Sequence, residues 1–250
     1  MDIPSDAQPI WSGPGSAAII DFGTGRGVFF PHWFEFLTLA AQSRDRARET
    51  SASSAEGQPV AEALTAILFS ALSAEAFINE LAEVAERVTD LPQSEAQFRT
   101  FSDLAETLDM IEKSQGQIDL KYQLASKVLS GKTFRRGESP LQDFSNLIQL
   151  RNELVHPRHR DRTTSMGHVQ PAAKIIRDLQ QRGLTTTRGR KQGDVPGGMS
   201  WLDEVKSAAV AGWAYETARV TITAILEMLP DDKRSPAPIL FRDRMEQIPR

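Results

Sequence analysis

The sequence contains no cysteine among its 250 residues. This absence excludes disulfide bonds, catalysis by a cysteine thiolate and zinc sites that use cysteine ligands. No run of about eighteen apolar residues occurs, so the sequence predicts no membrane-spanning segment. The acidic start MDIPSDAQPI precedes no apolar stretch of the kind that marks a secretory signal. We therefore expect a protein of the cytoplasm that does not contact a membrane.

The glycine-rich segment AAIIDFGTGRGVFF, residues 17–30, does not match a nucleotide-binding loop. Its glycines lack the dinucleotide-binding spacing, and no Gly-Lys-Ser/Thr follows. The glycines separate two short runs of β-branched and aromatic residues, which predicts a β-hairpin. The histidines do not form a metal-binding pattern either, because His159 and His168 fall in a predicted loop without an acidic cluster. The sequence thus predicts neither a metal ion nor a cofactor.

Helical periodicity dominates the remainder of the chain. The expected helices cover residues 31–49, 60–88, 98–113, 118–129, 139–156, 171–182 and 201–229. This pattern predicts an all-α fold, an up-and-down bundle of four to five helices with a small N-terminal β-hairpin extension. We expect three parts: an N-terminal extension over 1–58, the bundle over 59–229 with a basic loop insertion at 157–199, and a peripheral tail over 230–250.

Capping residues define the starts of two of these helices. Ser139, followed by Pro140 and Gln142, fits a capping box, in which a serine hydroxyl accepts a hydrogen bond from the backbone three residues later. Ser200 and Asp203 fit the same pattern at the start of the last long helix. Pro230 then predicts where that helix ends.

Charge is distributed unevenly along the chain, although the total is only −4. Residues 60–112 contain eleven acidic and two basic residues, a net charge of −9. Residues 151–191 contain ten basic and three acidic residues, a net charge of +7. Two interpretations follow: oppositely charged solvated faces that attract each other within the fold, or a surface that binds an anion.

An arginine interrupts the apolar face of the helix that follows Ser139. Arg151 lies in line with the apolar residues Phe144, Leu147, Ile148, Leu154 and Val155. Glu75 lies on the apolar row of the helix over 60–88. A lone buried charge is too costly to persist, so an ion pair between Arg151 and Glu75 is the structural interpretation of both residues.

A histidine ends the same helix. Pro157 disfavours helical geometry at His156, which leaves the imidazole at the helix C-terminus, where exposed carbonyls favour its protonated form. One interpretation is a residue that merely caps the helix. The other is catalytic: an arginine that holds phosphate oxygens and a titratable imidazole are the groups that metal-free cleavage of RNA requires.

The segment RNELVH, residues 151–156, resembles the signature of HEPN domains, and SAEAFINELAE, residues 73–83, resembles their first helix. The resemblance covers residues 60–229. It implies a homodimer whose two motifs line one groove and, in active members, a metal-independent endoribonuclease that serves as a toxin or defence effector and has a neutralising or regulatory protein partner. Carried over, Arg151, Asn152 and His156 would be the catalytic residues. Many members are inactive and serve as modules that bind RNA or protein.

Basic residues close to the motif are candidates for contact with an RNA backbone. They are Arg158, Arg160, Arg162, Lys174, Arg177, Arg188, Arg190 and Lys191. Two features weigh against a nuclease: Glu153 adds negative charge beside the motif, and the pI of about 5.7 is acidic. No aromatic residue accompanies the basic ones, so the sequence does not predict base stacking. A noncatalytic module that binds RNA or a protein remains the alternative.

Overall fold

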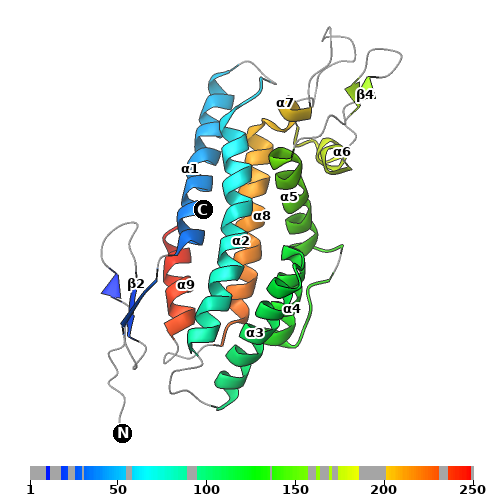
Figure 1. Ribbon diagram of the computed structural model, residues 1–250. Helices are drawn as coiled ribbons and strands as arrows, with labels where there is room; N and C mark the ends of the chain where they lie inside the picture. The colour runs from blue at the N-terminus through cyan, green and yellow to red at the C-terminus, as the bar shows by residue number, and fades with distance from the viewer. Residues whose placement is uncertain are drawn as a thin grey trace. The chain divides into compact units, whose positions relative to one another are not determined.

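The protein is described by a computed structural model, which places residues 10–11, 18–21, 26–29, 31–54, 58–88, 95–135, 137–156, 162–163, 169–170, 174–185, 201–230 and 236–248. The described part of the chain is a helical bundle (Figure 1). The chain divides into two compact units, each built from separated stretches of sequence. Unit 1 comprises residues 1–36, 72–142 and 220–250, and unit 2 comprises residues 37–71 and 143–219.

Three long helices contribute five or more residues to each of the two units. They are α1 (His32–Ser53), α2 (Glu62–Val88) and α8 (Ala208–Met228). Helix α1 continues four residues beyond the end expected at residue 49. Among the described residues, Glu62–Arg87 is long and apolar enough to cross a membrane by length and composition, and 56% of this stretch is buried inside the fold, as in the core helix of a globular protein.

Unit 1 contains a three-stranded sheet and three complete helices. The strands are β1 (Ile10–Trp11), β2 (Ala18–Asp21) and β3 (Arg26–Phe29). They pair antiparallel in the order β1-β2-β3, with Ile19 opposite both Ile10 and Val28. The helices are α3 (Glu95–Lys113), α4 (Ile118–Ser130) and α9 (Pro236–Glu246).

Helix α9 belongs to the core of unit 1, so the expectation of a peripheral C-terminal tail is wrong. Phe241 is fully buried, and its ring centroid lies 5.3 Å from that of Phe77 and 5.9 Å from that of Trp33. The rings of Trp33 and Phe77 meet edge to face at 5.6 Å. Aromatic side chains bury a large apolar area, and one such residue in a short segment is sufficient to fix that segment to a core. The error arises because these contacts join residues that are far apart in the sequence.

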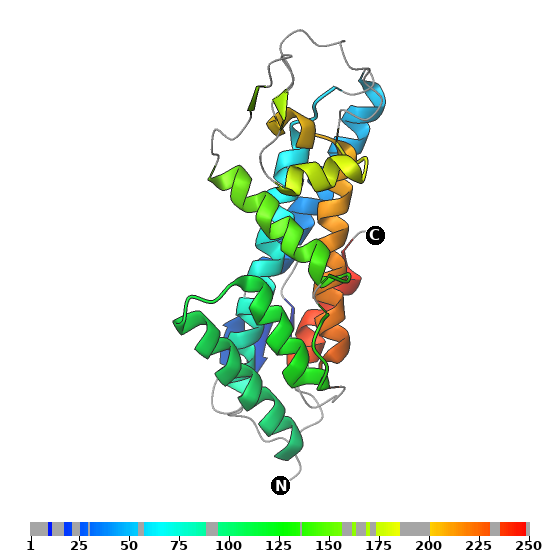
Figure 2. The same ribbon diagram turned by 90° about the vertical axis from the view of Figure 1, so that its right-hand side faces the viewer.

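Helices α3 and α4 run antiparallel beside each other (Figures 1 and 2). The chain turns between them at Gln115, whose φ of 54° lies in the left-handed region, and Gly116 donates its backbone N–H to the Ile111 carbonyl at 2.9 Å. The break near Gly116 that the sequence predicts is confirmed. Tyr122 of α4 is fully buried and donates its hydroxyl hydrogen to the Ala74 carbonyl at 2.8 Å, which fixes α4 against α2 within unit 1.

Unit 2 contains α6 (Lys174–Gln181), α7 (Trp201–Val205), nearly all of α5 (Leu141–Val155) and the short antiparallel pair β4 (Arg162–Thr163) and β5 (Val169–Gln170). Small side chains form part of its core: Ala47, Val60, Ala63, Ala66 and Ala211 make one buried cluster. Arg44 is buried as well, and its guanidinium lies 4.1 Å from the ring centroid of Tyr215. Small side chains allow close approach of helix backbones, which explains why alanine is frequent in this core.

The last long helix is broken, whereas the sequence predicts a continuous helix over 201–229. Helix α7 ends at Val205, and α8 begins at Ala208. Ser207 lies between them: its hydroxyl oxygen accepts the backbone N–H of Val210 at 3.0 Å and donates to the Leu184 carbonyl. Ser207 is therefore the N-cap of α8. Ser200 and the capping box assigned to it lie outside the described residues.

Replacement of Ser207 by alanine is expected to lower the free energy of unfolding by about 1–2 kcal/mol, because the N–H of Val210 loses its acceptor. Denaturation in urea, followed by circular dichroism, measures the effect. Threonine retains the hydroxyl, so Ser207→Thr is expected to stay closer to the parent than the alanine variant. Equal loss of stability in both variants would contradict the capping role.

Candidate functional site

Helix α5 begins within one residue of its predicted start, but a different group caps it. The helix starts at Leu141, and the backbone N–H of Gln142 donates to the Glu138 carbonyl at 2.9 Å. The predicted capping box is therefore wrong, because a backbone carbonyl takes the place that the sequence assigns to the Ser139 hydroxyl. The Ser139–Pro140 peptide bond is cis.

The buried face of α5 differs in part from the predicted one. Phe144 and Leu147 are fully buried, as predicted, and so is Leu150, which the apolar pattern did not include. Val155 is 49% exposed, so its assignment to the apolar face is wrong. The reason is rotational: Val155 lies about 140° around the helix from Leu150. Arg151 borders the buried face and is half-buried.

Asn152 links the two other candidate catalytic residues. Its side-chain oxygen accepts a hydrogen bond from the Arg151 guanidinium at 3.0 Å, and its backbone carbonyl accepts the N–H of His156 at 2.9 Å. Asn152 and His156 are both exposed. Asparagine is neutral, so this hydrogen bond orients the guanidinium without neutralising its charge.

Helical geometry persists to the amide of His156, the residue directly after α5. Arg151 and His156 are five positions apart and therefore leave the helix axis about 140° apart. The imidazole lies at the C-terminal end of α5, next to the last backbone carbonyls of the helix. Pro157, which the sequence reasoning uses to explain this corner, lies outside the described residues.

Glu75, the predicted partner of Arg151, lies on α2 in unit 1, whereas Arg151 belongs to unit 2. Its side chain is half-buried and faces a polar cavity formed by helices α2, α3 and α4. The ion pair between Glu75 and Arg151 stays a prediction.

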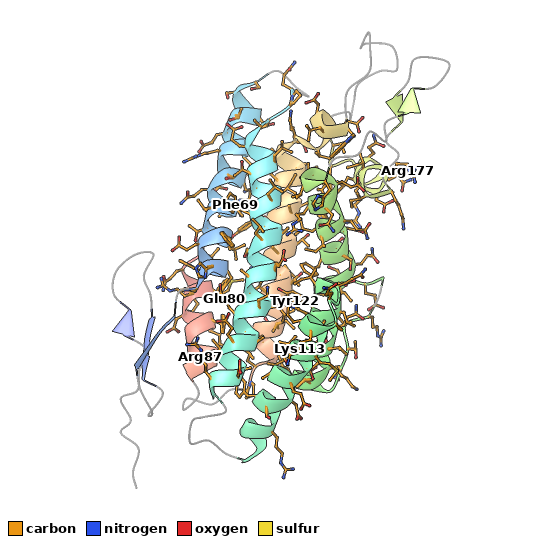
Figure 3. All side chains as sticks on the ribbon, in the orientation of Figure 1. Phe69, Glu80, Arg87, Lys113, Tyr122 and Arg177 are labelled. Atoms are coloured by element: carbon orange, nitrogen blue, oxygen red, sulfur yellow. The ribbon has the colours of Figure 1, made fainter. Side chains whose placement is uncertain are left out.

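Two of the predicted RNA-binding residues, Lys174 and Arg177, are exposed on α6. Figure 3 shows Arg177 on the outer side of this helix. The opposite face of α6 buries Ile175, Ile176 and Leu179. Arg162 belongs to β4, and its side chain is outside the described part of the chain, as are the residues Arg158, Arg160, Arg188, Arg190 and Lys191.

An ion pair holds α6 against α5 within unit 2. The Arg182 guanidinium lies 2.6 Å from the Asp143 carboxylate, with side chains 39% and 27% exposed. Arg182 follows the end of α6, and Asp143 lies in the first turn of α5. The sequence pattern did not predict this bond between Arg182 and Asp143. This ion pair thus fixes α6, which carries the exposed residues Lys174 and Arg177, to the helix that carries Arg151.

Sequence reasoning also missed a buried carboxyl group, Glu80 of α2. Its residue surface is only 8% exposed, and one oxygen accepts the backbone N–H of Trp33 at 3.2 Å and lies 3.3 Å from Nδ1 of His32. Burial away from water raises the pKa of Glu80 to about 8, and the hydrogen bond from Trp33 opposes this shift only in part. A signal was present in the sequence: Glu80 lies three residues after Phe77 and four before Val84, both of which are buried.

No group of three or more His, Asp or Glu side chains suited to a metal ion occurs within the described residues. No family model, curated protein or solved structure matches this chain. The chemistry of the residues on α5 and α6 therefore carries the argument for function.

Proposed function

We propose that the protein is an endoribonuclease that cleaves RNA without a metal ion, with Arg151, Asn152 and His156 as its catalytic residues. The observation that supports this function best is the pair of hydrogen bonds through which Asn152 connects the Arg151 guanidinium to the backbone of His156. These bonds hold Arg151, a permanent cation, and the backbone of His156, which carries an imidazole, within the last turns of one helix. Both groups remain near solvent, where a polymeric substrate has access to them.

The chemistry needs two proton transfers and one charge-stabilising group. His156 removes the proton of the ribose 2′-hydroxyl, and the 2′-oxygen attacks the adjacent phosphorus while the bond to the 5′-oxygen breaks. The leaving 5′-oxygen takes a proton from an imidazolium, and the products carry a 2′,3′-cyclic phosphate and a 5′-hydroxyl. Arg151 donates hydrogen bonds to the phosphate oxygens as negative charge develops in the transition state.

A homodimer accounts for the angle between the two catalytic side chains. Arg151 and His156 leave one helix about 140° apart, which hinders their simultaneous contact with a single phosphodiester. In a symmetric dimer the arginine of one copy and the histidine of the other face the same groove. We extend the proposal to this dimer and to a HEPN-like up-and-down bundle with an N-terminal β-hairpin extension. A role as a toxin or defence effector with a neutralising protein partner is part of the same proposal.

Incubation of the purified full chain with single-stranded RNA in excess chelator tests the activity. We expect cleavage that persists in chelator and products that end in cyclic phosphate. RNA with 2′-O-methyl groups and DNA of the same sequence serve as matched controls and are expected to stay intact, because neither has the attacking hydroxyl. Cleavage of DNA, or intact RNA after prolonged incubation with a panel of sequences, would refute the proposal.

A noncatalytic RNA-binding module is the second candidate, and the exposed cations of α6 favour it. Reversal of both charges, Lys174→Glu with Arg177→Glu, is expected to weaken RNA binding by about 10-fold or more at moderate salt and to reduce its salt dependence. The variant Lys132→Glu with Arg135→Glu introduces the same charge change at exposed residues of unit 1 and is the control. Equal loss in both variants would show a nonspecific charge effect instead of a surface on α6. If RNA binds but stays intact, the module is noncatalytic.

A further inference from the structure

Residues of α2, α3, α4 and the turn between α3 and α4 line a polar cavity of about 270 Å³ within unit 1, which is open to solvent. Its walls are formed by Glu75, Asn79, Glu112, Gln115, Gly116, Ile118 and Lys121. Lys121 is the most buried charged group of the cavity, with a side chain only 7% exposed. Because a buried ammonium is costly unless it is paired, its presence here requires fixed polar neighbours.

Two of those neighbours are part of the same cavity. The Lys121 ammonium donates to the side-chain oxygen of Asn79 at 2.7 Å and to a carboxylate oxygen of Glu112. These bonds orient both acceptors: the Asn79 oxygen is held by the lysine, which leaves its NH₂ group as a donor, and the second oxygen of Glu112 remains an acceptor. An ammonium has three N–H groups, so Lys121 also has one for a ligand. The cavity wall thus carries the N–H donors of Lys121 and Asn79 next to an acceptor oxygen of Glu112.

We propose that this cavity binds a guanine base. Guanine combines two adjacent N–H donors, at N1 and N2, with an acceptor at O6. A carboxylate accepts from both donors at once, and the lysine and asparagine donate to O6. The carboxylates of Glu75 and Glu112, the Lys121 ammonium and the Asn79 amide supply this set. The Ile118 side chain offers an apolar contact for one face of the base.

The other bases fit this set of groups less well. Adenine presents the lone pair of N1 where guanine has an N–H donor, so a carboxylate placed there repels it. Cytosine and uracil lack the second adjacent N–H donor. The cavity has a net charge of −1 from two glutamates and one lysine, which favours a neutral base and opposes a phosphate. We therefore expect the cavity to bind guanosine more tightly than guanosine phosphates.

The inference goes beyond the proposed ribonuclease, because binding of a nucleoside requires no cleavage. Guanine reaches the cavity from two sources, a free nucleoside or an unstacked base of single-stranded RNA. Isothermal titration of the full chain with guanosine, and separately with a short 2′-O-methyl RNA that contains one guanine, distinguishes them. The 2′-O-methyl groups prevent cleavage, so failure of this test is distinct from failure of the nuclease proposal.

We expect saturable binding of guanosine, binding about 10-fold weaker for inosine, which lacks the N2 amino group, and binding at least about 10- to 100-fold weaker for adenosine. If only the RNA binds, with the same loss when inosine replaces its guanine, the source is RNA. No binding of either probe at millimolar concentration, or equal affinity for guanosine and adenosine, would overturn the proposal.

Glu112→Gln tests the assignment of the cavity. The Glu112 side chain is 70% exposed, and glutamine keeps a side-chain oxygen that accepts from Lys121, whereas its NH₂ group offers a donor where the base needs an acceptor. The variant is expected to bind guanosine about 10-fold more weakly or worse. Glu106→Gln removes the same charge from an exposed position of α3 and is expected to bind as the parent does. Equal affinity in all three proteins would place guanosine elsewhere and overturn the proposal.

Discussion

His156→Ala is expected to lower kcat/KM for RNA cleavage by about 100- to 10,000-fold, the range that a general acid or base contributes. The same variant is expected to unfold within about 0.5 kcal/mol of the parent, because the histidine is exposed and follows the last residue of α5. Cleavage of a fluorescent RNA and urea denaturation measure the two quantities on the same samples. Loss of activity with unchanged stability separates a chemical role from a structural one.

Variants of Arg151 and Asn152 are expected to lose different amounts of activity in the same RNA-cleavage assay. Arg151→Lys keeps the positive charge but loses the planar group that binds two phosphate oxygens, so we expect partial activity, above that of Arg151→Ala. Asn152→Ala removes the acceptor that holds the Arg151 guanidinium at 3.0 Å, and we expect a smaller loss than for either neighbour. Gln149→Ala, an exposed amide one turn earlier on α5, is the control. A His156→Ala variant as active as the parent would end the nuclease proposal and favour the binding module.

Local sequence patterns predicted helix bounds well where those bounds depend on neighbouring residues only. The helix expected over 118–129 is α4, Ile118–Ser130, and the helix expected to end at residue 182 is followed by Gly183, which has a left-handed φ of 68°. The N–H of Leu184 donates to the Leu179 carbonyl at 3.1 Å across that end. Such features depend on neighbouring residues only, so one sequence is sufficient to find them.

Contacts between residues that are far apart in the sequence explain the predictions that were wrong. The burial of Phe241 depends on Trp33 and Phe77, and the break before α8 depends on the Leu184 carbonyl that binds the Ser207 hydroxyl. Neither contact is visible from local periodicity. In the candidate site, the sequence pattern placed Arg151 within the apolar face, whereas the residue is half-buried, and it did not predict the bond to Asn152. It also selected Glu75, which is half-buried, and passed over Glu80, the more buried carboxyl group of the same helix.

Glu80 has a large expected effect on the pH dependence of stability. Its pKa in the folded protein is raised from 4.5 to about 8, chiefly by burial. The folded state therefore holds this proton more tightly than the unfolded state, so the contribution to stability is complete below pH 4.5 and is lost as the pH rises to about 8. At about 1.4 kcal/mol per pH unit, the loss is on the order of 4 kcal/mol across this window.

Glu80→Gln is expected to abolish that loss. The amide does not titrate, and its oxygen still accepts the N–H of Trp33, so the first turn of α1 keeps its bond to α2. The variant should match the parent near pH 4.5 and exceed its free energy of unfolding by a few kcal/mol, roughly 2–4, at pH 8. Urea denaturation at several pH values between these limits measures the difference, in which the contributions of all other titrating groups cancel.

Glu83→Gln is the matched control for this series. Glu83 lies three residues further along α2, is exposed, and raises the pKa of Glu80 through charge repulsion, a smaller cause than burial. Its replacement is therefore expected to leave most of the pH dependence in place. Parallel curves for the parent and Glu80→Gln would mean that the buried carboxyl is ionised at neutral pH and is stabilised by the start of α1, where Trp33 donates and the helix dipole favours negative charge. The difference in pH dependence between the parent and Glu80→Gln thus decides whether desolvation or the N-terminus of α1 has the larger effect on the pKa of Glu80.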